Sequence, residues 1–322
     1  MMQGATELWT GCPFGCKYCL PVARRWAREY QASDDSGIAG STARPRTGDP
    51  LNLAGLRTAP RPVPPAFLSL FSDPYPPQEE AAGVTRQAIA LLHARGAGVR
   101  VLTKSGLRAV RDFRRGRRAR SGLGAHPDDG FGATLTFSRD EDSLAWEPGA
   151  ALPSERLAGL EEAHRRGIST WANFMPVIDP EQTLELMARA APFVELFDLA
   201  PLETEGVCAA PRSFDWPTFA RRAVELARRL GVAAYARRQL AGEVSAPDEG
   251  MVMDRNFWFA LCEAARPEWR HVAPRTRAAV VFASAEVWHG EMFEAQMRGG
   301  AAAAAGLHRK AAAAVAARLR GS

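Results

Sequence analysis

The chain has 322 residues, carries 41 Lys and Arg against 36 Asp and Glu, and has a formal net charge of +5. Its hydrophobic fraction of 46% is typical of a globular protein with a packed core. A transmembrane helix is excluded because the sequence has no run of about 18 apolar residues, and the start MMQGATELW lacks the features of a secretory signal. We therefore expect a soluble cytoplasmic protein that does not contact a membrane.

The expected elements begin with a strand at 5–10, a helix at 21–31 and a long Ser-, Gly- and Pro-rich loop at 33–65. A regular alternation follows. Strands are expected at 66–72, 98–104, 131–138, 168–177, 193–201 and 232–238. Helices are expected at 78–96, 107–116, 153–167, 180–191 and 215–231.

Strands that alternate with helices imply parallel strands joined by right-handed crossovers. The pattern predicts an α/β fold, a partial (β/α)6 TIM-type barrel over residues 1–245. A small, mostly helical appendage with an Ala-rich tail is expected over 246–322. In such barrels the chemistry lies at the C-terminal ends of the strands. Several informative residues fall at those ends, namely Asp73, Lys104, Ser138 and Pro176.

Three of the five cysteines, Cys12, Cys16 and Cys19, lie close together after the first expected strand. In a reducing cytosol, clustered thiols are more often metal ligands or redox groups than disulfides. A structural zinc site or a [4Fe–4S] cluster normally takes four protein ligands. A fourth ligand would have to come from Cys208, Cys262 or a histidine. With three ligands only, one iron stays open to a substrate or cofactor.

The spacing C-x3-C-x2-C, with an aromatic residue before the last cysteine, resembles the radical S-adenosylmethionine (SAM) superfamily. The resemblance implies that Cys12, Cys16 and Cys19 hold a [4Fe–4S] cluster whose fourth iron is chelated by SAM. Reduction would cleave SAM to a 5′-deoxyadenosyl radical that abstracts hydrogen from a substrate, while the protein orients and shields the cofactor. The barrel is then of the radical SAM kind, and a reducing partner such as flavodoxin or ferredoxin is implied.

Further segments resemble the spore photoproduct lyase-like (DNA repair photolyase-like) branch over residues 5–240. They are SDPYPPQE, TR, VLTKS, RD, FSRD and EPGAALPSERL, in this order. By this resemblance, Lys104 and Ser138 contact the methionyl carboxylate of SAM, a role that suits a cation and a hydroxyl donor. Tyr18 matches a residue near the adenine, and Asp73 an acidic group at the amino end of SAM.

Structural alternatives stay open for these residues. Lys104 could be a surface lysine at a strand end, Tyr18 a packing residue, and Asp73 a partner of Arg86 or Lys104. A bracing role for the fourth crossover is expected of Glu147 and Arg156.

The sequence departs from a true spore photoproduct lyase at two positions. Leu70 stands where the lyase has its hydrogen-donating cysteine, and Leu20 stands where it has a tyrosine after the third cluster cysteine. Leucine neither donates a hydrogen atom nor relays a radical, so we expect no efficient repair of the DNA lesion. Cys208 could replace the donor or be a bystander thiol, and Cys262 is expected in the core.

The segment 108–120 contains seven arginines, which would suit a nucleic-acid or phosphate patch or a solvated face. His126 and His289 are expected at the surface or behind the site. Three interpretations therefore remain: a radical SAM enzyme with an unknown substrate, a nucleic-acid-directed radical SAM enzyme, and a non-enzymatic zinc or iron–sulfur binding protein.

Overall fold

The computed structural model describes residues 5–19, 43–46, 65–69, 72–114, 121–201 and 215–236. The chain divides into two compact units. The first comprises Met1–Leu186 and Leu202–Arg212, and the second Met187–Pro201 and Ser213–Ser322. The expected appendage at 246–322 lies outside the described residues, so the boundary expected at 245 stays a prediction.

In the first unit, parallel strands form one sheet in the order β1, β4, β5, β6 and β7. Their bounds are β1 Ala5–Thr6, β4 Ala66–Leu68, β5 Val99–Thr103, β6 Gly130–Thr134 and β7 Ser169–Val177. The helices are α3 Glu79–Ala82, α4 Val84–Ala94, a 3₁₀ helix Gly106–Asp112, α5 Asp140–Trp146 and α6 Pro153–Arg165, and the boundary between the units falls within α7 Pro180–Ala190. The strands that the structure describes do not close into a barrel.

The second unit repeats the same strand–helix–strand pattern. A 3₁₀ helix Ala191–Phe193 leads to β8 Leu196–Pro201, which is followed by α8 Trp216–Leu230 and β9 Ala233–Ala236. Strands β8 and β9 are parallel, as predicted. The Asp215 side chain caps α8 by accepting from the Thr218 N–H at 3.0 Å, and Gly231 ends the helix with φ +68°.

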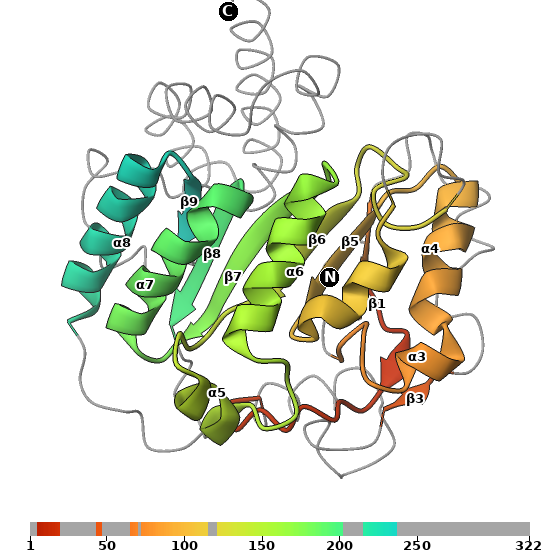
Figure 1. The fold of residues 1–322 in the computed structure, drawn as a ribbon, viewed down its shortest axis with the longest axis horizontal. Helices are drawn as coiled ribbons and strands as arrows, with labels where there is room; N and C mark the ends of the chain where they lie inside the picture. The colour runs from red at the N-terminus through yellow and green to blue at the C-terminus, as the bar shows by residue number, and fades with distance from the viewer. Residues whose placement is uncertain are drawn as a thin grey trace, which may run out of the picture. The chain divides into compact units, whose positions relative to one another are not determined.

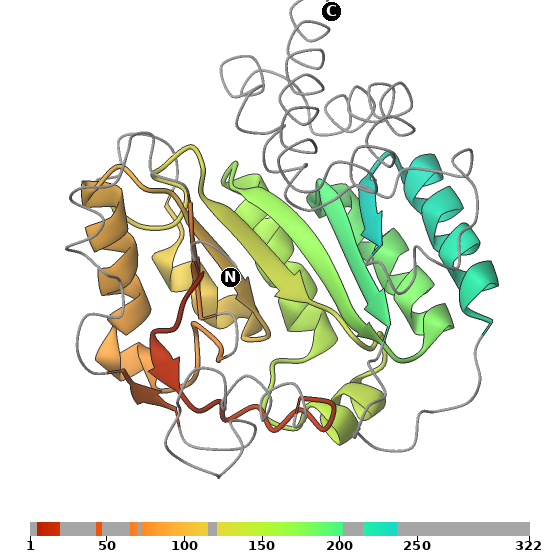
Figure 2. The same cartoon turned by 180° about the vertical axis from the view of Figure 1, so that it is seen from behind.

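The two faces of the sheet in the first unit carry different residues. Helices α4 and α6 cover one face, as Figure 1 shows, and Phe131 of β6 packs there beside Gly159 of α6. Figure 2 shows the opposite face, over which no described helix of this unit lies. On that face Trp171 of β7 lies opposite Gly132 of β6. A Cβ on Gly132 would come within 2.5 Å of the Trp171 ring, so only glycine leaves the indole its space.

The strand expected at 5–10 is two strands in different sheets. β1 pairs with β4, whereas β2 (Trp9–Thr10) pairs antiparallel with β3 (Arg44–Pro45). Between them the Leu8 N–H donates to the Ser69 hydroxyl at 3.1 Å instead of to a strand carbonyl. β4 ends at Leu68, earlier than expected, because Ser69 adopts the left-handed region with φ +51°.

The helix expected at 78–96 is also two helices. Gly83 takes φ +61°, and its N–H donates to the Glu79 carbonyl at 2.9 Å, which ends α3 before α4 begins. The helix expected at 107–116 is a 3₁₀ helix in its described part. Helix α5 was not predicted, although three acidic residues in its first turn suit a helix N-terminus.

Candidate functional site

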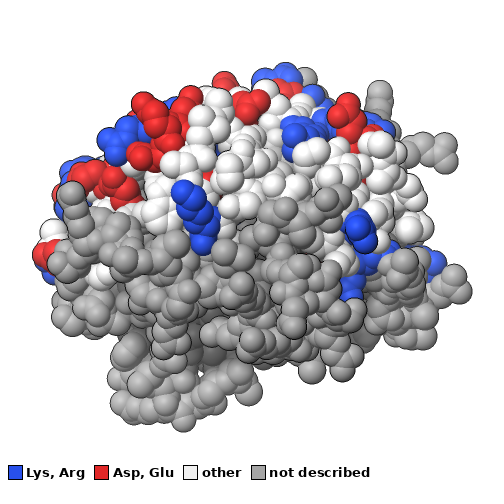
Figure 3. Space-filling model, turned by 90° about the horizontal axis from the view of Figure 1, so that it is seen from below, with Lys and Arg blue, Asp and Glu red and all other residues white. Residues whose placement is uncertain are grey.

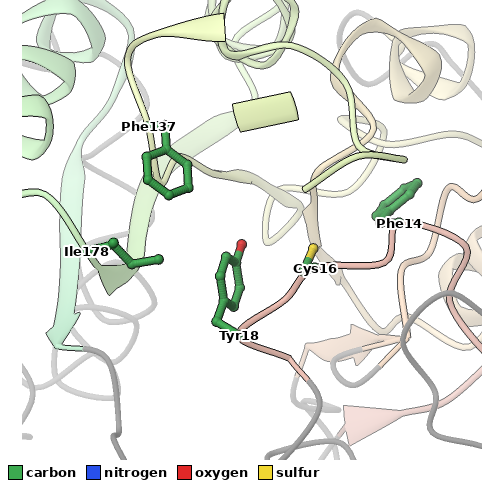
Figure 4. Close-up of a cluster of buried hydrophobic side chains, with 5 residues drawn as sticks. All are labelled: Phe14, Cys16, Tyr18, Phe137 and Ile178. Carbon is green, nitrogen blue, oxygen red and sulfur yellow. The ribbon is translucent and has the colours of Figure 1, made fainter. Parts of the chain in front are cut away.

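The cysteine loop, residues 11–19, lies at the edge of the sheet where the parallel strands of the first unit end (Figures 1 and 2). Figure 4 shows Cys16 and Tyr18 beside Phe137 and Ile178, which follow β6 and β7. Cys12 and Cys19 pack against the same cluster of buried side chains. All three thiols are free, and Cys16 is 5% exposed. The structure thus brings the predicted cysteines to one apolar cluster at the strand ends.

Burial shapes the chemistry of these thiols. It raises the pKa of Cys16 to about 11 and also raises the pKa of Cys12 and Cys19. The charge of Asp73 adds to the rise at Cys12, and Lys104 opposes it at Cys16 and Cys19. Among the described residues, no group of three or more His, Cys, Asp or Glu is already arranged to hold a metal ion. A metal bound by these thiols would displace their protons.

Lys104 follows β5 and faces the cysteine loop. Its Nζ lies 5.4 Å from the centroid of the Tyr18 ring, within the range of a cation–π contact. Burial disfavours the charged ammonium, but Cys16 and Glu147 outweigh this effect and raise the pKa of Lys104. The predicted position of Lys104 at a strand end is confirmed. The structure adds that it is a cation beside the thiols.

A buried polar network lies directly behind Tyr18. The Tyr18 hydroxyl donates to Glu147 and lies 3.2 Å from the Thr136 hydroxyl. Glu147 forms an ion pair with Arg156 at 2.6 Å, with both side chains at most 1% exposed. Arg156 also donates to the Thr134 carbonyl at 3.0 Å. The expected bracing pair therefore exists, and it also contacts the cysteine loop.

Asp73 follows β4 and accepts several hydrogen bonds. The donors are the Tyr75 N–H at 2.8 Å, the Thr103 hydroxyl at 2.7 Å, the Ser105 hydroxyl at 3.1 Å and the Lys104 N–H at 2.9 Å. These contacts join the ends of β4 and β5. Arg86, the other partner considered from the sequence, instead binds Asp112 at 2.7 Å. A role for Asp73 at the amino end of SAM stays a prediction.

Ser138 lies just beyond β6, and its contacts bear on its predicted role. Its hydroxyl donates to the Glu185 carboxylate at 2.7 Å, and its N–H donates to the Gln182 side chain at 2.8 Å. A second carboxylate at this hydroxyl would meet the negative charge of Glu185. Binding of the SAM carboxylate by Ser138 therefore stays a prediction. It requires the Ser138 hydroxyl to give up its hydrogen bond to Glu185 and donate to the SAM carboxylate instead.

Asn173 of β7 was missed by the sequence analysis. It is 3% exposed, and its Nδ2 donates to the Thr134 hydroxyl at 3.3 Å. Its Oδ1 is buried without a hydrogen-bond partner among the described residues. Thr134 is close to the network behind Tyr18. Thr136, which contacts Tyr18, is two residues further along, roughly 7 Å in an extended chain. The sequence does contain a signal for this residue, since Asn173 is the single amide in the apolar stretch TWANFMPV. Buried amides are rarely left unpaired, so an amide in such a stretch points to a hydrogen-bonding role.

The arginine-rich segment is partly described, and its described arginines have internal partners. Arg108 donates to the Tyr75 carbonyl at 3.1 Å, Arg111 to Glu79 at 2.5 Å, and Arg114 to the Arg111 carbonyl at 3.1 Å. Figure 3 shows one face of the molecule, on which many basic side chains lie beside acidic ones. Residues 115–120 lie outside the described residues. Nucleic-acid binding through 108–120 stays a prediction.

The remaining predicted positions lie away from the site or outside the described residues. His126 donates its N–H to Asp129 at 3.1 Å in a turn that precedes β6. Leu20, Leu70, Cys208, Cys262 and His289 lie outside the described residues. In the described part of the chain, no helix is long and apolar enough to cross a bilayer.

No family model matches the sequence, and no curated protein matches it. The structure resembles that of Streptococcus suis SuiB bound to S-adenosylmethionine, with a TM-score of 0.51, 11% identity, and coverage of 75% of this chain and 52% of SuiB. The chain thus spans about half the length of SuiB.

Two further solved structures are similar at lower TM-scores. A mutant spore photoproduct lyase with bound AdoMet and dinucleoside spore photoproduct has a TM-score of 0.47, 16% identity, and coverage of 72% of this chain and 75% of that chain. The radical S-adenosylmethionine methyltransferase TsrM from Kitasatospora setae has a TM-score of 0.40, 13% identity, and coverage of 61% and 35%. The likeness to SuiB concerns the fold alone, and it confirms the predicted α/β class.

Proposed function

We propose that this chain is a radical SAM enzyme in which Cys12, Cys16 and Cys19 bind a [4Fe–4S] cluster and SAM occupies the open iron. One observation carries the proposal. A C-x3-C-x2-C loop lies at the C-terminal edge of a parallel sheet with the fold of SuiB, and a lysine cation faces it. When bound, the cluster and SAM supply a 5′-deoxyadenosyl radical that abstracts hydrogen from a substrate.

The residues around the loop fit such a cofactor chemically. Cysteine thiolates are the usual ligands of iron–sulfur clusters, and three of them would leave the fourth iron of a [4Fe–4S] cluster to SAM. The apolar side chains Phe14, Phe137 and Ile178 beside them keep water from the loop. The Oδ1 of Asn173 lies on the sheet face opposite α4 and α6 and has no partner among the described residues, so it can accept a hydrogen bond from a polar group of a bound ligand. Thiols, apolar shielding and a free acceptor together support a cofactor that is partly apolar and partly hydrogen-bonding.

Each polar residue of the site has a proposed task. Lys104 binds the carboxylate of SAM by its positive charge, and the Tyr18 ring lies along the adenine. Ser138 hydrogen-bonds the same carboxylate, and Asp73 orients the amino end. These assignments come from the family resemblance. The position of Lys104 beside the cysteine loop supports its part most directly.

The reaction beyond SAM cleavage is proposed as hydrogen abstraction from a substrate of unknown class, with a flavodoxin or ferredoxin as reductant in the cytoplasm. SuiB has also been solved with the precursor peptide SuiA, and spore photoproduct lyase with a dinucleoside lesion. Leu20 and Leu70 argue against repair of that lesion by this chain.

The test is anaerobic reconstitution with iron and sulfide, followed by reduction with dithionite in the presence of SAM. We expect about four irons per chain and release of 5′-deoxyadenosine, measured by liquid chromatography. Cys16→Ala should lose both, whereas Cys208→Ala should keep the iron. A colourless preparation that holds zinc, or bound iron without 5′-deoxyadenosine, would instead identify a non-enzymatic metal-binding protein.

A further inference from the structure

We propose that residues 146–151, from the last residue of α5 into the connection to α6, form a docking segment that fixes the conformation of the cysteine loop, with Glu147 and Gly149 as positioning residues. The assignment of iron–sulfur binding to that loop rests on the proposed function. The docking itself rests on contacts between two segments that are far apart in the sequence.

Two backbone hydrogen bonds join the docking segment to the cysteine loop on either side of Cys16. The Lys17 N–H donates to the Trp146 carbonyl at 2.9 Å, and the Gly149 N–H donates to the Phe14 carbonyl at 2.9 Å. Since residues 14 and 17 bracket Cys16, the backbone that carries this thiol is tied at both ends to the same segment. The thiol position then depends on the docking segment.

Gly149 is required by the closeness of the two segments. A Cβ at this position would collide with the Pro13 carbonyl oxygen and would lie 2.8 Å from the Phe14 Cα. Gly149 is not among the glycines with a left-handed φ, so backbone strain does not exclude alanine here. Contact with the cysteine loop alone excludes it.

Glu147 supplies the third tie. Its carboxylate accepts from the hydroxyl of Tyr18, which lies between Cys16 and Cys19 in the sequence. Glu147 in turn forms an ion pair with Arg156 at 2.6 Å, and Glu147 is 1% exposed. A hydrogen bond to a buried carboxylate is stronger than one between neutral groups, so this contact holds Tyr18 in one position.

The docking segment is in turn fixed to the sheet and to α6. The Ala151 N–H donates to the Lys104 carbonyl at the end of β5, at 2.9 Å. The Ala151 carbonyl accepts from the Arg156 side chain at 2.7 Å. The cysteine loop is therefore positioned by the fold through residues 146–151. We expect it to keep its conformation before any iron is bound.

The first experiment uses the metal-free, reduced protein. Cys16 is buried, so its alkylation by iodoacetamide requires local opening of the loop. We expect Gly149→Ala and Glu147→Gln to speed alkylation of Cys16 about tenfold, measured by peptide mass spectrometry. Gly98→Ala is the matched control. A Cβ on Gly98 would lie 2.6 Å from the Asp128 Cβ, and Gly98, like Gly149, has no left-handed φ. Gly98 precedes β5, at the end of that strand away from Lys104 and the cysteine loop.

The second experiment measures iron content and the electron paramagnetic resonance spectrum after reconstitution. Gly149→Ala and Glu147→Gln should bind less iron or give a shifted spectrum, while Gly98→Ala should match the wild type. If Glu147→Gln does not fold, Tyr18→Phe removes the same hydrogen bond and leaves Glu147 paired with Arg156.

Equal alkylation of Cys16 in the wild type and the docking variants would overturn the proposal. So would equal acceleration in the Gly98→Ala control, because general destabilisation would then explain the effect. The alkylation result does not depend on a cluster. A wild-type protein that binds no iron but shows the expected alkylation pattern would thus refute the proposed function and support the docking.

Discussion

Replacing Arg156 with methionine tests how strongly the fold depends on the charge network behind the cysteine loop. Arg156 and Glu147 form an ion pair at 2.6 Å with side chains 1% and 0% exposed. Arg156 also donates to the carbonyls of Ala151 at 2.7 Å and Thr134 at 3.0 Å. Methionine keeps most of the length and apolar stem of the side chain but provides no charge and no donor.

The expected loss is about 3–5 kcal/mol of the free energy of unfolding at neutral pH, because the change removes the ion-pair partner of a buried carboxylate. Burial disfavours the Glu147 carboxylate, yet Arg156 and Lys104 outweigh it and lower the pKa of Glu147. In the wild type the ionised group is therefore stabilising above its unfolded pKa, and this contribution is lost as pH falls. The difference between wild type and variant should accordingly shrink in acid.

The assay is urea unfolding followed by tryptophan fluorescence, with Arg165→Met as the matched control. Arg165 lies on the same helix α6 and pairs with Glu162 at a similar 2.7 Å, but its side chain is 63% exposed. An exposed pair contributes little to stability, so Arg165→Met should stay within the error of the titration. The reasoning is refuted if Arg156→Met unfolds no more easily than Arg165→Met at neutral pH.

Three further predictions concern the site and the sheet. Lys104→Ala should weaken SAM binding about ten- to a hundredfold, from loss of about 1.5–3 kcal/mol, and leave the iron content unchanged. Calorimetric titration measures this, and an unchanged dissociation constant would put Lys104 outside the SAM site. Gly132→Ala should lower stability by about 1–3 kcal/mol because its Cβ would enter the Trp171 ring, and added Trp171→Leu should recover part of the loss. A melting temperature equal to that of the wild type would contradict this packing. Under dithionite the protein should release 5′-deoxyadenosine but recover little thymine from a dinucleoside spore photoproduct, since by the sequence resemblance Leu70 and Leu20 would stand where the lyase has a thiol and a tyrosine. Efficient repair would show this prediction wrong, and its loss in Cys208→Ala would identify the substitute donor.

The elements predicted best are those whose local pattern agrees with their packing. The strand expected at 98–104 is β5, Val99–Thr103, and the helix expected at 153–167 is α6, Pro153–Arg165, with proline in its first turn. Where a contact with a distant residue decides the bounds of an element, the prediction from the local pattern was wrong. The apolar stretch at 5–10 looks continuous, but the hydroxyl of Ser69, 61 residues away, takes the Leu8 N–H and divides the strand.

The candidate site shows the same division. The cysteine spacing predicts the loop, because metal ligands in a local set leave a signature in the sequence. The contact of Tyr18 with Glu147 joins residues 129 positions apart, and no local pattern predicts it. The same holds for Asp73, whose donors come mostly from the residues around the end of β5. The unpaired Asn173 acceptor depends on which side chains the register of β6 and β7 brings together.

The charges at the cysteine loop carry one further consequence. Glu147 is the anion of the network, and Arg156 already forms an ion pair with it at 2.6 Å. Lys104 adds a second cation, whose Nζ lies 5.4 Å from the centroid of the Tyr18 ring. Because Glu147 is already paired with Arg156, a further anion would stabilise the partly buried Lys104 ammonium. Two anions suit this position, a cysteine thiolate and the carboxylate of SAM. The Lys104→Ala variant separates them. If only SAM binding weakens, the ammonium serves the carboxylate. Loss of iron as well would contradict the prediction above and would show that the ammonium also stabilises the thiolates.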